Sequence, residues 1–357
     1  ALSRPLGMKS LHATYAGKDA FLKDVPRLII ENNLHGIDID PRCAQIAGLS
    51  LWLRAQKAWQ RLGLKPAERP AIKHSNIVCA EPMPGEKGLL REFVEREFPA
   101  AERAVCLRLL ETIFDKMQLA GEAGSLLKIE EEIRSAIEEA RRQATTPRLF
   151  DTDVRSLNSD DFWERIEERI YAALRDYAEQ AENGGGFQRR LFAEDAARGF
   201  AFIDVCRKRY DVVVMNPPFA ETERELQAYL KHSYPTNWTN LYAAFIQRAR
   251  ELSESRIGFV CPDGFLAAHR MKHVRAELIL HRLLESWACL GKDVFEDMGL
   301  GTVTGVVNSR SSPYLPAMVQ VSDQGLGVST LVNETTVSDR TNFILTPELV
   351  QSVGQSW

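Results

Sequence analysis

The sequence predicts an α/β protein with a mostly parallel sheet, interrupted by a large all-helical insertion. Four apolar residues follow Asp211, three of them β-branched, which is typical of a short strand buried on both faces. A second strand, predicted at Leu34–Pro41, is followed by a helical pattern as far as Leu62. Residues 86–200 show only helical patterns and are rich in Glu, Arg, Leu and Ala. Strands that alternate with helices favour an α/β class, with the insertion between two strands.

The length and composition set the size of the fold. A chain of 357 residues with 45% hydrophobic residues is long enough for one large α/β domain with an insertion, or for two domains. It begins with Ala and its first ten residues resemble mid-chain sequence, so we expect a piece of a longer protein. The predicted segments are an N-terminal sheet part at 1–85, the helical insertion at 86–200, a second sheet part at 201–312, and a linker or the start of a following domain at 313–357.

Charge and cysteine usage exclude several classes of protein. The net charge of −4 argues against a surface coated in positive charge, so any nucleic-acid contact has to come from local basic patches. The six cysteines are far apart and form no Cys-x-x-Cys, which is not zinc-ligand spacing and favours reduced thiols in a cytoplasm. No apolar run reaches membrane-spanning length and no signal peptide is visible, so we expect no membrane partner.

Two carboxylates stand at the end of the first predicted strand. Pro26–Asn33 is predicted to be a short helix with proline in its first turn, and it leads into the strand that ends at Asp38 and Asp40. In nucleotide-binding α/β folds, an acid at this position accepts hydrogen bonds from both ribose hydroxyls. Asp38 is the candidate for that role and Asp40 for the helix N-cap, with a solvated cap as the alternative for each.

The segment 86–200 is predicted to be helical throughout. Apolar residues recur at every third or fourth position from Ile129 to Ala140 and again from Phe162 to Tyr177, with Glu and Arg on the other faces. Asn183–Gly186 contains three glycines, but no strand precedes them and no Lys-Ser/Thr follows, so a flexible connector is favoured over a phosphate-binding loop. The charge runs are interpreted as solvated helix faces.

A stiff polar loop ends the strand that begins at Asp211. It consists of Asn216, Pro217, Pro218 and Phe219. Two prolines cannot continue a ladder, and open α/β sheets place their ligands at the carboxyl ends of strands. The side-chain carbonyl of Asn216 and the main-chain carbonyl of Pro217 can accept both hydrogens of an amine on a planar group, with the ring of Phe219 beside it. The alternative is a rigid turn that closes a core strand.

The remaining elements follow in an α/β order. The helix His269–Leu284 is basic, and its Arg270, Lys272 and Arg275 form a candidate contact to a phosphate backbone, with an ordinary cationic face as the alternative. From Ser311 the sequence shows no core pattern of its own. The other predicted elements are a polar helix to about Lys231, a helix capped by Asn240 with Leu241, Phe245, Ala249 and Leu252 toward the sheet, a strand at Arg256–Pro262 and a strand at Thr302–Val307.

Several of these motifs resemble one family of enzymes. Asn216–Phe219, then Asn240–Phe245, then the strand at Arg256–Cys261 with Pro262, resemble motifs IV, V and VI of the γ-type adenine-N6 DNA methyltransferases. The unit Gly36–Pro41 resembles motif II of class I methyltransferases. With the large helical insertion, the chain looks most like the phage-exclusion (BREX-type) methyltransferases and related Eco57I-like enzymes, over roughly residues 26–309.

The resemblance implies a class I methyltransferase fold, a seven-stranded, mostly parallel, Rossmann-like sheet between helices. It implies S-adenosylmethionine as cofactor, no metal, and an adenine flipped from double-stranded DNA as substrate. Asn216 and Pro217 would hold the exocyclic amine, Phe219 would stack on the base, and Asp38 and Ile39 would contact the cofactor ribose. Leu241, Tyr242 and Phe245 would wall the transfer region. Asn76 and Ile77, predicted in the loop after a strand that starts at Ala71, would contact the cofactor's adenine, or Asn76 would only make a turn.

One part of the family pattern is missing from the sequence. The family binds the methionine end of its cofactor with a loop of the form Asp/Phe-x-x-x-Gly-x-Gly, on a strand between those ending at Asp38 and Met215. Nothing like it stands upstream of Asp38. The target-recognition domain expected after residue 320 is also missing. We therefore expect the complete protein to be an active DNA methyltransferase of restriction-modification or phage defence, with further defence proteins as partners. We expect this chain to be an incomplete and inactive part of it.

Two other function classes share some of these sequence features. Asn-Pro-Pro-aromatic loops also occur in methyltransferases that act on protein glutamine or RNA bases, although those chains tend to be compact. A non-catalytic methyltransferase-fold module that binds DNA or a partner protein is favoured by the missing Gly-rich loop and disfavoured by the intact Asn216–Phe219.

Overall fold

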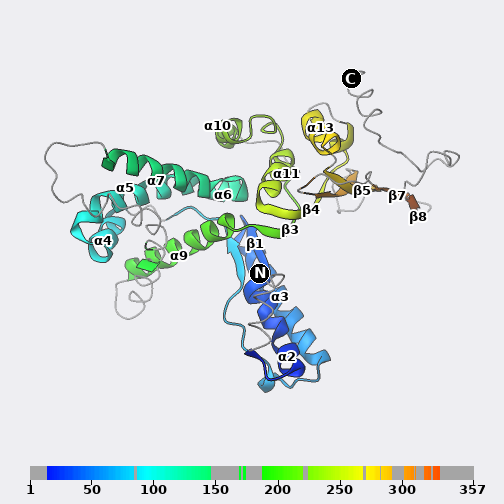
Figure 1. The fold of residues 1–357 in the computed structure, drawn as a ribbon, viewed down its shortest axis with the longest axis horizontal. Coiled ribbons are helices and arrows are strands. Elements are labelled where there is room, and N and C mark those ends of the chain that lie inside the picture. The colour runs from blue at the N-terminus through cyan, green and yellow to red at the C-terminus, as the bar shows by residue number, and fades with distance from the viewer. Residues whose placement is uncertain are drawn as a thin grey trace. The chain divides into compact units, whose positions relative to one another are not determined.

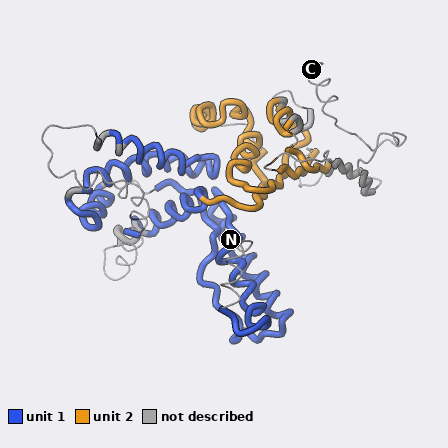
Figure 2. Tube along the Cα trace, in the orientation of Figure 1, with its two compact units in different colours: residues 1–207 blue, residues 208–357 orange. Residues whose placement is uncertain are grey.

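The computed structural model describes residues 14–83, 87–145, 169, 172–173, 187–219, 224–267, 271–281, 283–291, 301–308, 310, 317–322 and 325–329. Outside the helical insertion, helices alternate with strands as far as Leu284–Gly291, so the predicted α/β class is confirmed (Figure 1). The chain divides into two compact units, residues 1–207 and residues 208–357 (Figure 2). The described strands form two sheets, one in each unit, where the resemblance implied a single seven-stranded sheet.

The first unit begins with a helix that is longer than predicted. Helix α2 already starts at Lys18, so Pro26 lies inside it and the last turn before β1 is a π-helix. Arg27 stabilises this end, because it pairs with Glu31 at 2.6 Å and donates to Asp24 at 2.7 Å. The elements here are α2 Lys18–Leu28, the π-helical Ile29–Asn33, β1 His35–Asp38, α3 Pro41–Arg61, the 3₁₀ turn Pro66–Glu68 and β2 Asn76–Cys79.

Helix α3 is fastened to α2 by a buried tryptophan. Trp59 is fully buried against Ile30 and Ala55, and its Nε1 donates to the carbonyl of Lys23 at 2.7 Å. Strands β1 and β2 pair in parallel, from His35 opposite Asn76 to Asp38 opposite Cys79. The parallel pairing brings the carboxyl ends of both strands to one edge of this small sheet.

The insertion is helical in every part that the structure describes, as predicted. Its second predicted stripe, from Phe162 to Tyr177, and the glycines at 184–186 lie outside the described residues. Helix α7 confirms the first stripe, because Ile129 and Ile133 are buried. The helices are α4 Lys87–Glu97, α5 Ala100–Lys116, α6 Ala120–Ala123, α7 Ile129–Thr145 and α9 Phe187–Arg207, with 3₁₀ turns at Met117–Leu119 and Gly124–Leu126.

The second unit contains more strands than the sequence predicts. The predicted helix His269–Leu284 is too long, because a strand begins at Leu284, and two further strands follow Ser311 where no core pattern was expected. The elements are β3 Tyr210–Met215, α10 Arg224–Ser233, α11 Leu241–Leu252, β4 Ser253–Pro262, α12 Gly264–Ala267, α13 Lys272–Leu280, β5 Leu284–Gly291, β6 Thr302–Asn308, β7 Ala317–Ser322 and β8 Gly325–Ser329.

The six strands of this unit lie in the order β3-β4-β6-β5-β7-β8. Strand β3 is parallel to β4, and β5 is parallel to β7. Strand β6 runs antiparallel to both of its neighbours, and β8 runs antiparallel to β7. The sheet is therefore mixed, with β3 as its parallel edge strand.

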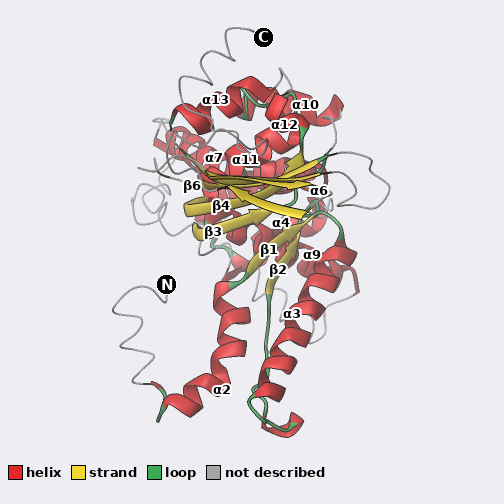
Figure 3. Cartoon of the chain, turned by 90° about the vertical axis from the view of Figure 1, so that its right-hand side faces the viewer, coloured by secondary structure: helices red, strands yellow, loops and turns green. Residues whose placement is uncertain are grey.

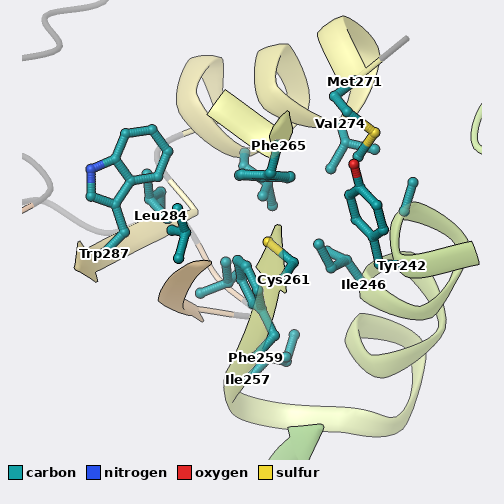
Figure 4. Packing of buried hydrophobic residues seen from close by; sticks show 14 of the residues in the cluster. Tyr242, Ile246, Ile257, Phe259, Cys261, Phe265, Met271, Val274, Leu284 and Trp287 are labelled. Atoms are coloured by element: carbon teal, nitrogen blue, oxygen red, sulfur yellow. The ribbon is translucent and has the colours of Figure 1, made fainter. Parts of the chain in front are cut away.

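Helices α11, α12 and α13 pack on one face of this sheet (Figure 3). Phe265 stands at the centre of the packing, edge to face with Phe259 at 5.7 Å and with Trp287 at 6.3 Å between ring centroids (Figure 4). Of the inward residues predicted for α11, Ala249 belongs to this core, Leu241 and Leu252 are buried, and Phe245 is only half-buried. Tyr242 and Ile246 contribute to the core in addition. Burial of the larger apolar side chains of this face stabilises the unit.

Strand β3 is buried on one face only, so the prediction of burial on both faces is wrong. Val213 and Met215 pack against the core of the second unit. Val212 and Val214, which point to the other face, are exposed.

Candidate active site

The carboxyl end of β1 presents Asp38 in a defined orientation. One carboxylate oxygen, Oδ1, accepts the backbone N–H of Asp40 at 2.9 Å, and the main-chain carbonyl of Asp38 accepts the N–H of Ala80 at 2.8 Å. The other oxygen, Oδ2, accepts no hydrogen bond from the described part of the chain. A carboxylate that is held at one oxygen and open at the other is suited to accept hydrogen bonds from a ligand's hydroxyl groups.

Asp40 is the N-cap of α3, as predicted. Its Oδ1 accepts the N–H of Arg42 at 2.9 Å, and its Oδ2 pairs with the Arg42 guanidinium at 2.6 Å. These contacts with Arg42 lower the pKa of the Asp40 carboxyl to about 2. The carboxylate is therefore committed to the helix terminus.

Asn76 does not lie where the sequence reading placed it. It is the first residue of β2 and sits opposite His35, at the amino end of the strand, so its predicted position after the strand is wrong. Its amide donates to the carbonyl of Glu31 at 2.9 Å, which ties the strand to the π-helical turn. Ile77 lies inside the strand, and a Cβ added at Gly36 would meet its Cδ1 at 2.8 Å, so Ile77 packs on its neighbouring strand.

Glu81, which the sequence analysis missed, follows the carboxyl end of β2. The pKa of the Cys79 thiol is raised to about 11, first by burial and then by the carboxylates of Glu81 and Asp38. Glu81 is partly exposed and lies 3.8 Å from the guanidinium of Arg198. The sequence analysis ended this strand before Asn76, whereas it ends at Cys79. The later end puts Glu81 at the same edge of the sheet as Asp38.

Part of the helical insertion touches this edge. Gly124 has a φ of +52°, and a Cβ added there would lie 3.1 Å from Cγ2 of Ile39. Only glycine adopts this backbone conformation readily. Ile39 itself is exposed apart from this contact region, so it projects beyond the end of β1.

In the second unit, the Asn-Pro-Pro-Phe loop leaves the carboxyl end of β3. Asn216 and Pro218 are exposed, Pro217 is buried, and Phe219 is half-buried. The buried proline anchors the loop while the amide of Asn216 faces solvent. This arrangement exposes the planar amide of Asn216 as an acceptor at the edge of a parallel strand, three residues before the half-buried Phe219.

Helix α11 begins at the same edge, because it leads antiparallel into β4, which is parallel to β3. Asn240 is its N-cap residue, as predicted, although only its main-chain carbonyl and not its side chain accepts from the first turn. Only 2% of the surface of Asn240 is exposed, and its Oδ1 has no hydrogen-bond partner among the described residues. A buried acceptor without a partner is costly and is found where a ligand or a structural rearrangement supplies the missing donor.

The three residues of α11 that were predicted to wall the methyl-transfer region lie in different surroundings. Tyr242 is buried, and its ring lies beside Met271 and Val274, so it belongs to the core (Figure 4). Leu241 is buried at the start of the helix, and Phe245 is half-buried outside that core. Of the three, Leu241 and Phe245 therefore remain candidates for the wall.

The other predicted site residues are only partly described. Arg270 lies outside the described residues, and α13 contains Lys272 and Arg275 without a description of their side chains. Among the described residues, no group of three His, Cys, Asp or Glu side chains is arranged to hold a metal ion. None of the described helices is both long and apolar enough to cross a bilayer.

These features define an α/β protein with acids at the end of one parallel pair and an Asn-Pro-Pro-Phe loop at the end of another. Residues 32–295 match the family of Eco57I restriction-modification methylases. Since the match spans more than half of the chain, the protein belongs to that family.

The sequence identity to an individual relative is low. The chain is 24% identical, over 335 residues, to the adenine-specific methyltransferase BrxX of Escherichia coli O9:H4 (strain HS), which covers 88% of this chain. The matched part is 25% of that relative, so this chain spans about a quarter of its length.

Solved structures give weaker likenesses. A putative class I S-adenosylmethionine-dependent methyltransferase from Listeria monocytogenes aligns at 12% identity over 66% of this chain and 92% of its own, with a TM-score of 0.28. A type I restriction-modification methyltransferase subunit from Streptococcus thermophilus aligns at 11% identity over 85% and 80%, with a TM-score of 0.29. The family assignment rests on the match over residues 32–295.

Proposed function

We propose that this chain is part of a site-specific DNA methyltransferase that transfers a methyl group from S-adenosylmethionine to the N6 amine of adenine. The observation that carries the proposal is the exposed Asn216 beside the buried Pro217, at the carboxyl end of β3, in a chain of the Eco57I methylase family. The adenine specificity of the BrxX relative supports the choice of base. The proposed setting is restriction-modification or phage defence in the cytoplasm.

The chemistry follows from two acceptors and one ring. The Oδ1 of Asn216 and the carbonyl of Pro217 accept the two hydrogens of the exocyclic amine, which leaves the nitrogen lone pair less delocalised into the base. Phe219 stacks on the base and holds it in plane with the acceptors. After the nitrogen has been alkylated, its extra proton leaves to water, so the site needs no general base.

S-adenosylmethionine supplies an electrophilic methyl group on a sulfonium, with the thioether as leaving group. Asp38 fits the ribose end of this cofactor, because Oδ1 is fixed by the N–H of Asp40 while Oδ2 accepts no bond from the described chain. Glu81 lies at the same edge. In place of Asn76, it is the proposed contact to the adenine of the cofactor. Ile39 contributes an apolar surface beside them.

Double-stranded DNA is the proposed partner, with other phage-defence proteins as further partners. The net charge of −4 leaves DNA binding to local basic groups. Arg270, Lys272 and Arg275 are the proposed contacts to the phosphate backbone. Neutralising one of them is expected to weaken binding for all sequences alike.

The test of the proposed site is Asn216→Ala in the complete protein. Methylation is expected to fall by at least about a hundredfold, as for the loss of a group that stabilises developing charge, while DNA affinity changes little. Asn33→Ala, at an exposed asparagine of the first unit, is the matched control and is expected to leave both unchanged. Methylation that survives in Asn216→Ala would disprove the acceptor role, and an inactive complete protein that binds DNA would favour a non-catalytic module.

A second test concerns this chain alone. We expect the chain 1–357 to show no micromolar binding of labelled S-adenosylmethionine, because the sequence has no Gly-rich loop for the methionine end of the cofactor. Equilibrium dialysis measures this directly, with the complete protein as the positive control. Micromolar binding by the chain 1–357 would show that the missing loop is not needed.

A further inference from the structure

The loop that leads into α11 holds one buried acceptor that is not satisfied like its neighbours. The amide of Asn237 donates to Oε1 of Gln247 at 2.8 Å, and its main-chain N–H donates to the carbonyl of Tyr234 at 2.9 Å. Asn240 closes this loop, and its main-chain carbonyl accepts the N–H of Ala243 at 3.1 Å. Its side-chain Oδ1 is buried and accepts no hydrogen bond within the described residues. Such an acceptor is costly unless a donor reaches it when the protein works.

This acceptor belongs to the same edge of the sheet as the Asn-Pro-Pro-Phe loop. Met215, the last residue of β3, packs against the core to which Tyr242, in the first turn of α11, belongs. Asn216 directly follows Met215, and Asn240 stands two positions before Tyr242. Since α11 leads into β4 and β4 is parallel to β3, the start of the helix and the end of β3 point to one edge. The two asparagines therefore come from neighbouring elements at that edge.

The amide of Asn216 needs a partner that fixes its orientation. In the proposed reaction its Oδ1 accepts a hydrogen of the substrate amine, but the amide can turn by about 180° and then presents its own NH₂ group. Two NH₂ groups do not pair, so the turned amide does not hold the substrate. Asn216 is exposed, and its side chain makes no hydrogen bond with the part of the chain that the structure describes. An acceptor for its Nδ2 would keep its Oδ1 toward the substrate.

A count of donors favours this amide as the partner of Asn240. Pro217 and Pro218 have no N–H, and Asn216 is the residue of the loop whose side chain carries one. The unsubstituted ring nitrogens of adenine are acceptors. Both hydrogens of its amine are already taken by Asn216 and Pro217 in the proposed complex. The substrate base therefore has no N–H left for Asn240, whereas Nδ2 of Asn216 has two.

We propose that Asn240 is a positioning residue of this site: its Oδ1 accepts a hydrogen bond from Nδ2 of Asn216 and so directs Oδ1 of Asn216 to the substrate amine. The inference rests on the proposed function, because it assigns an orientation to the same amide. The pairing satisfies the buried acceptor of Asn240 and one N–H of Asn216 together. Asn216 is exposed, so its side chain is free to turn toward the start of α11.

Substitution of Asn240 in the complete protein is the first test. Asn240→Ala is expected to lower kcat for DNA methylation by at least about tenfold and to leave KM for DNA unchanged, since the amide of Asn216 is then free to turn. Asn240→Asp keeps an acceptor and is expected to retain kcat within about threefold. Unchanged kcat in Asn240→Ala, or equal losses in the two variants, would overturn the proposal.

A pair of aspartate substitutions separates this hydrogen bond from a general effect on stability. Asn216→Asp keeps an acceptor for the substrate amine, and the amide of Asn240 can turn to donate to it, so we expect this variant to retain measurable activity. When Asn216→Asp is combined with Asn240→Asp, two carboxylates face each other. We expect kcat of the double variant to lie at least about tenfold below the product of the two single effects.

The matched control combines Asn216→Asp with Asn237→Asp, at a second buried asparagine of the same loop. The two effects should multiply in this control, because Asn237 already donates to Gln247. Equal coupling in both double variants would contradict a direct bond between Asn216 and Asn240. If Asn216→Ala abolishes methylation but the effects at 216 and 240 multiply, only the positioning role fails. A complete protein that does not methylate DNA would overturn the proposed function and this inference together.

Discussion

The helical insertion and the two sheet parts differ in how completely they bury their apolar side chains. Of the large apolar side chains that are exposed in the described residues, one, Leu191, belongs to the insertion, two belong to β3, and nine belong to residues 22–62. The described part of the insertion therefore leaves almost no large apolar side chain open. The sheet parts form secondary structure but leave apolar surface open, so their packing depends on neighbours that the described residues do not supply.

Helix α3 contains this contrast within a single element. Trp59 is fully buried, while Trp52, seven residues earlier, is 47% exposed. The exposed side of the helix also includes Ile46, Leu49 and Leu53. One side of α3 holds the first unit together, and the other is an apolar stripe without a described cover.

The largest effect is expected at the buried side of α3. Trp59→Ala removes a buried ring and its bond to Lys23, and should cost about 3–5 kcal/mol in the free energy of unfolding of the chain 1–357. Trp52→Ala on the same helix should change it by less than about 0.5 kcal/mol. Urea titration followed by circular dichroism measures both, and similar losses for the two variants would remove the contrast between the sides of α3.

An intermediate effect is expected where the insertion meets the end of β1. Gly124→Ala forces a side chain into a backbone conformation with φ of +52° and places its Cβ 3.1 Å from Ile39, so we expect a loss of about 1–3 kcal/mol. Gly88→Ala, where a Cβ meets nothing within 4 Å, is the control in α4 and should be neutral or slightly stabilising. Equal stability of the two variants would show that the insertion does not pack tightly against Ile39 at the end of β1.

The smallest effect on stability is expected at Asn240. Its buried Oδ1 has no partner in the part of the chain that the structure describes, so Asn240→Ala should leave the free energy of unfolding within about 1 kcal/mol of its original value. Asn237→Ala, which removes a 2.8 Å bond to Gln247, should destabilise by about 1–3 kcal/mol. If Asn240→Ala proves as costly as Asn237→Ala, the amide has a structural partner and is not available to a ligand.

The elements that could be predicted from the sequence are those with strong local signals. The valines before Asn216 and the two prolines after it indicate a strand and its end, and both are present. The same valines also suggested burial on both faces. That part failed because burial depends on what lies against Val212 and Val214, which no local pattern specifies.

The errors at β2 and β5 have a common cause. Ile72 was assigned to a strand, but it packs as a loop residue against the core around Trp59, so the strand starts later, at Asn76. Leu284 continues an apolar pattern from α13, yet it pairs with Val307 in a ladder. In both cases a contact between residues far apart in sequence decides the boundary, and this also explains why Glu81 was missed.

The distance along the chain between β2 and β3 has a consequence during protein synthesis. Residues 80–209 separate the two strands, and at about 5–20 residues per second a ribosome needs roughly 7–26 s to make them. Helices of the insertion can form within microseconds as they emerge, whereas β1 and β2 must wait as a short pair with little cover. We therefore expect the nascent chain to offer this pair to chaperones before β3 has left the exit tunnel.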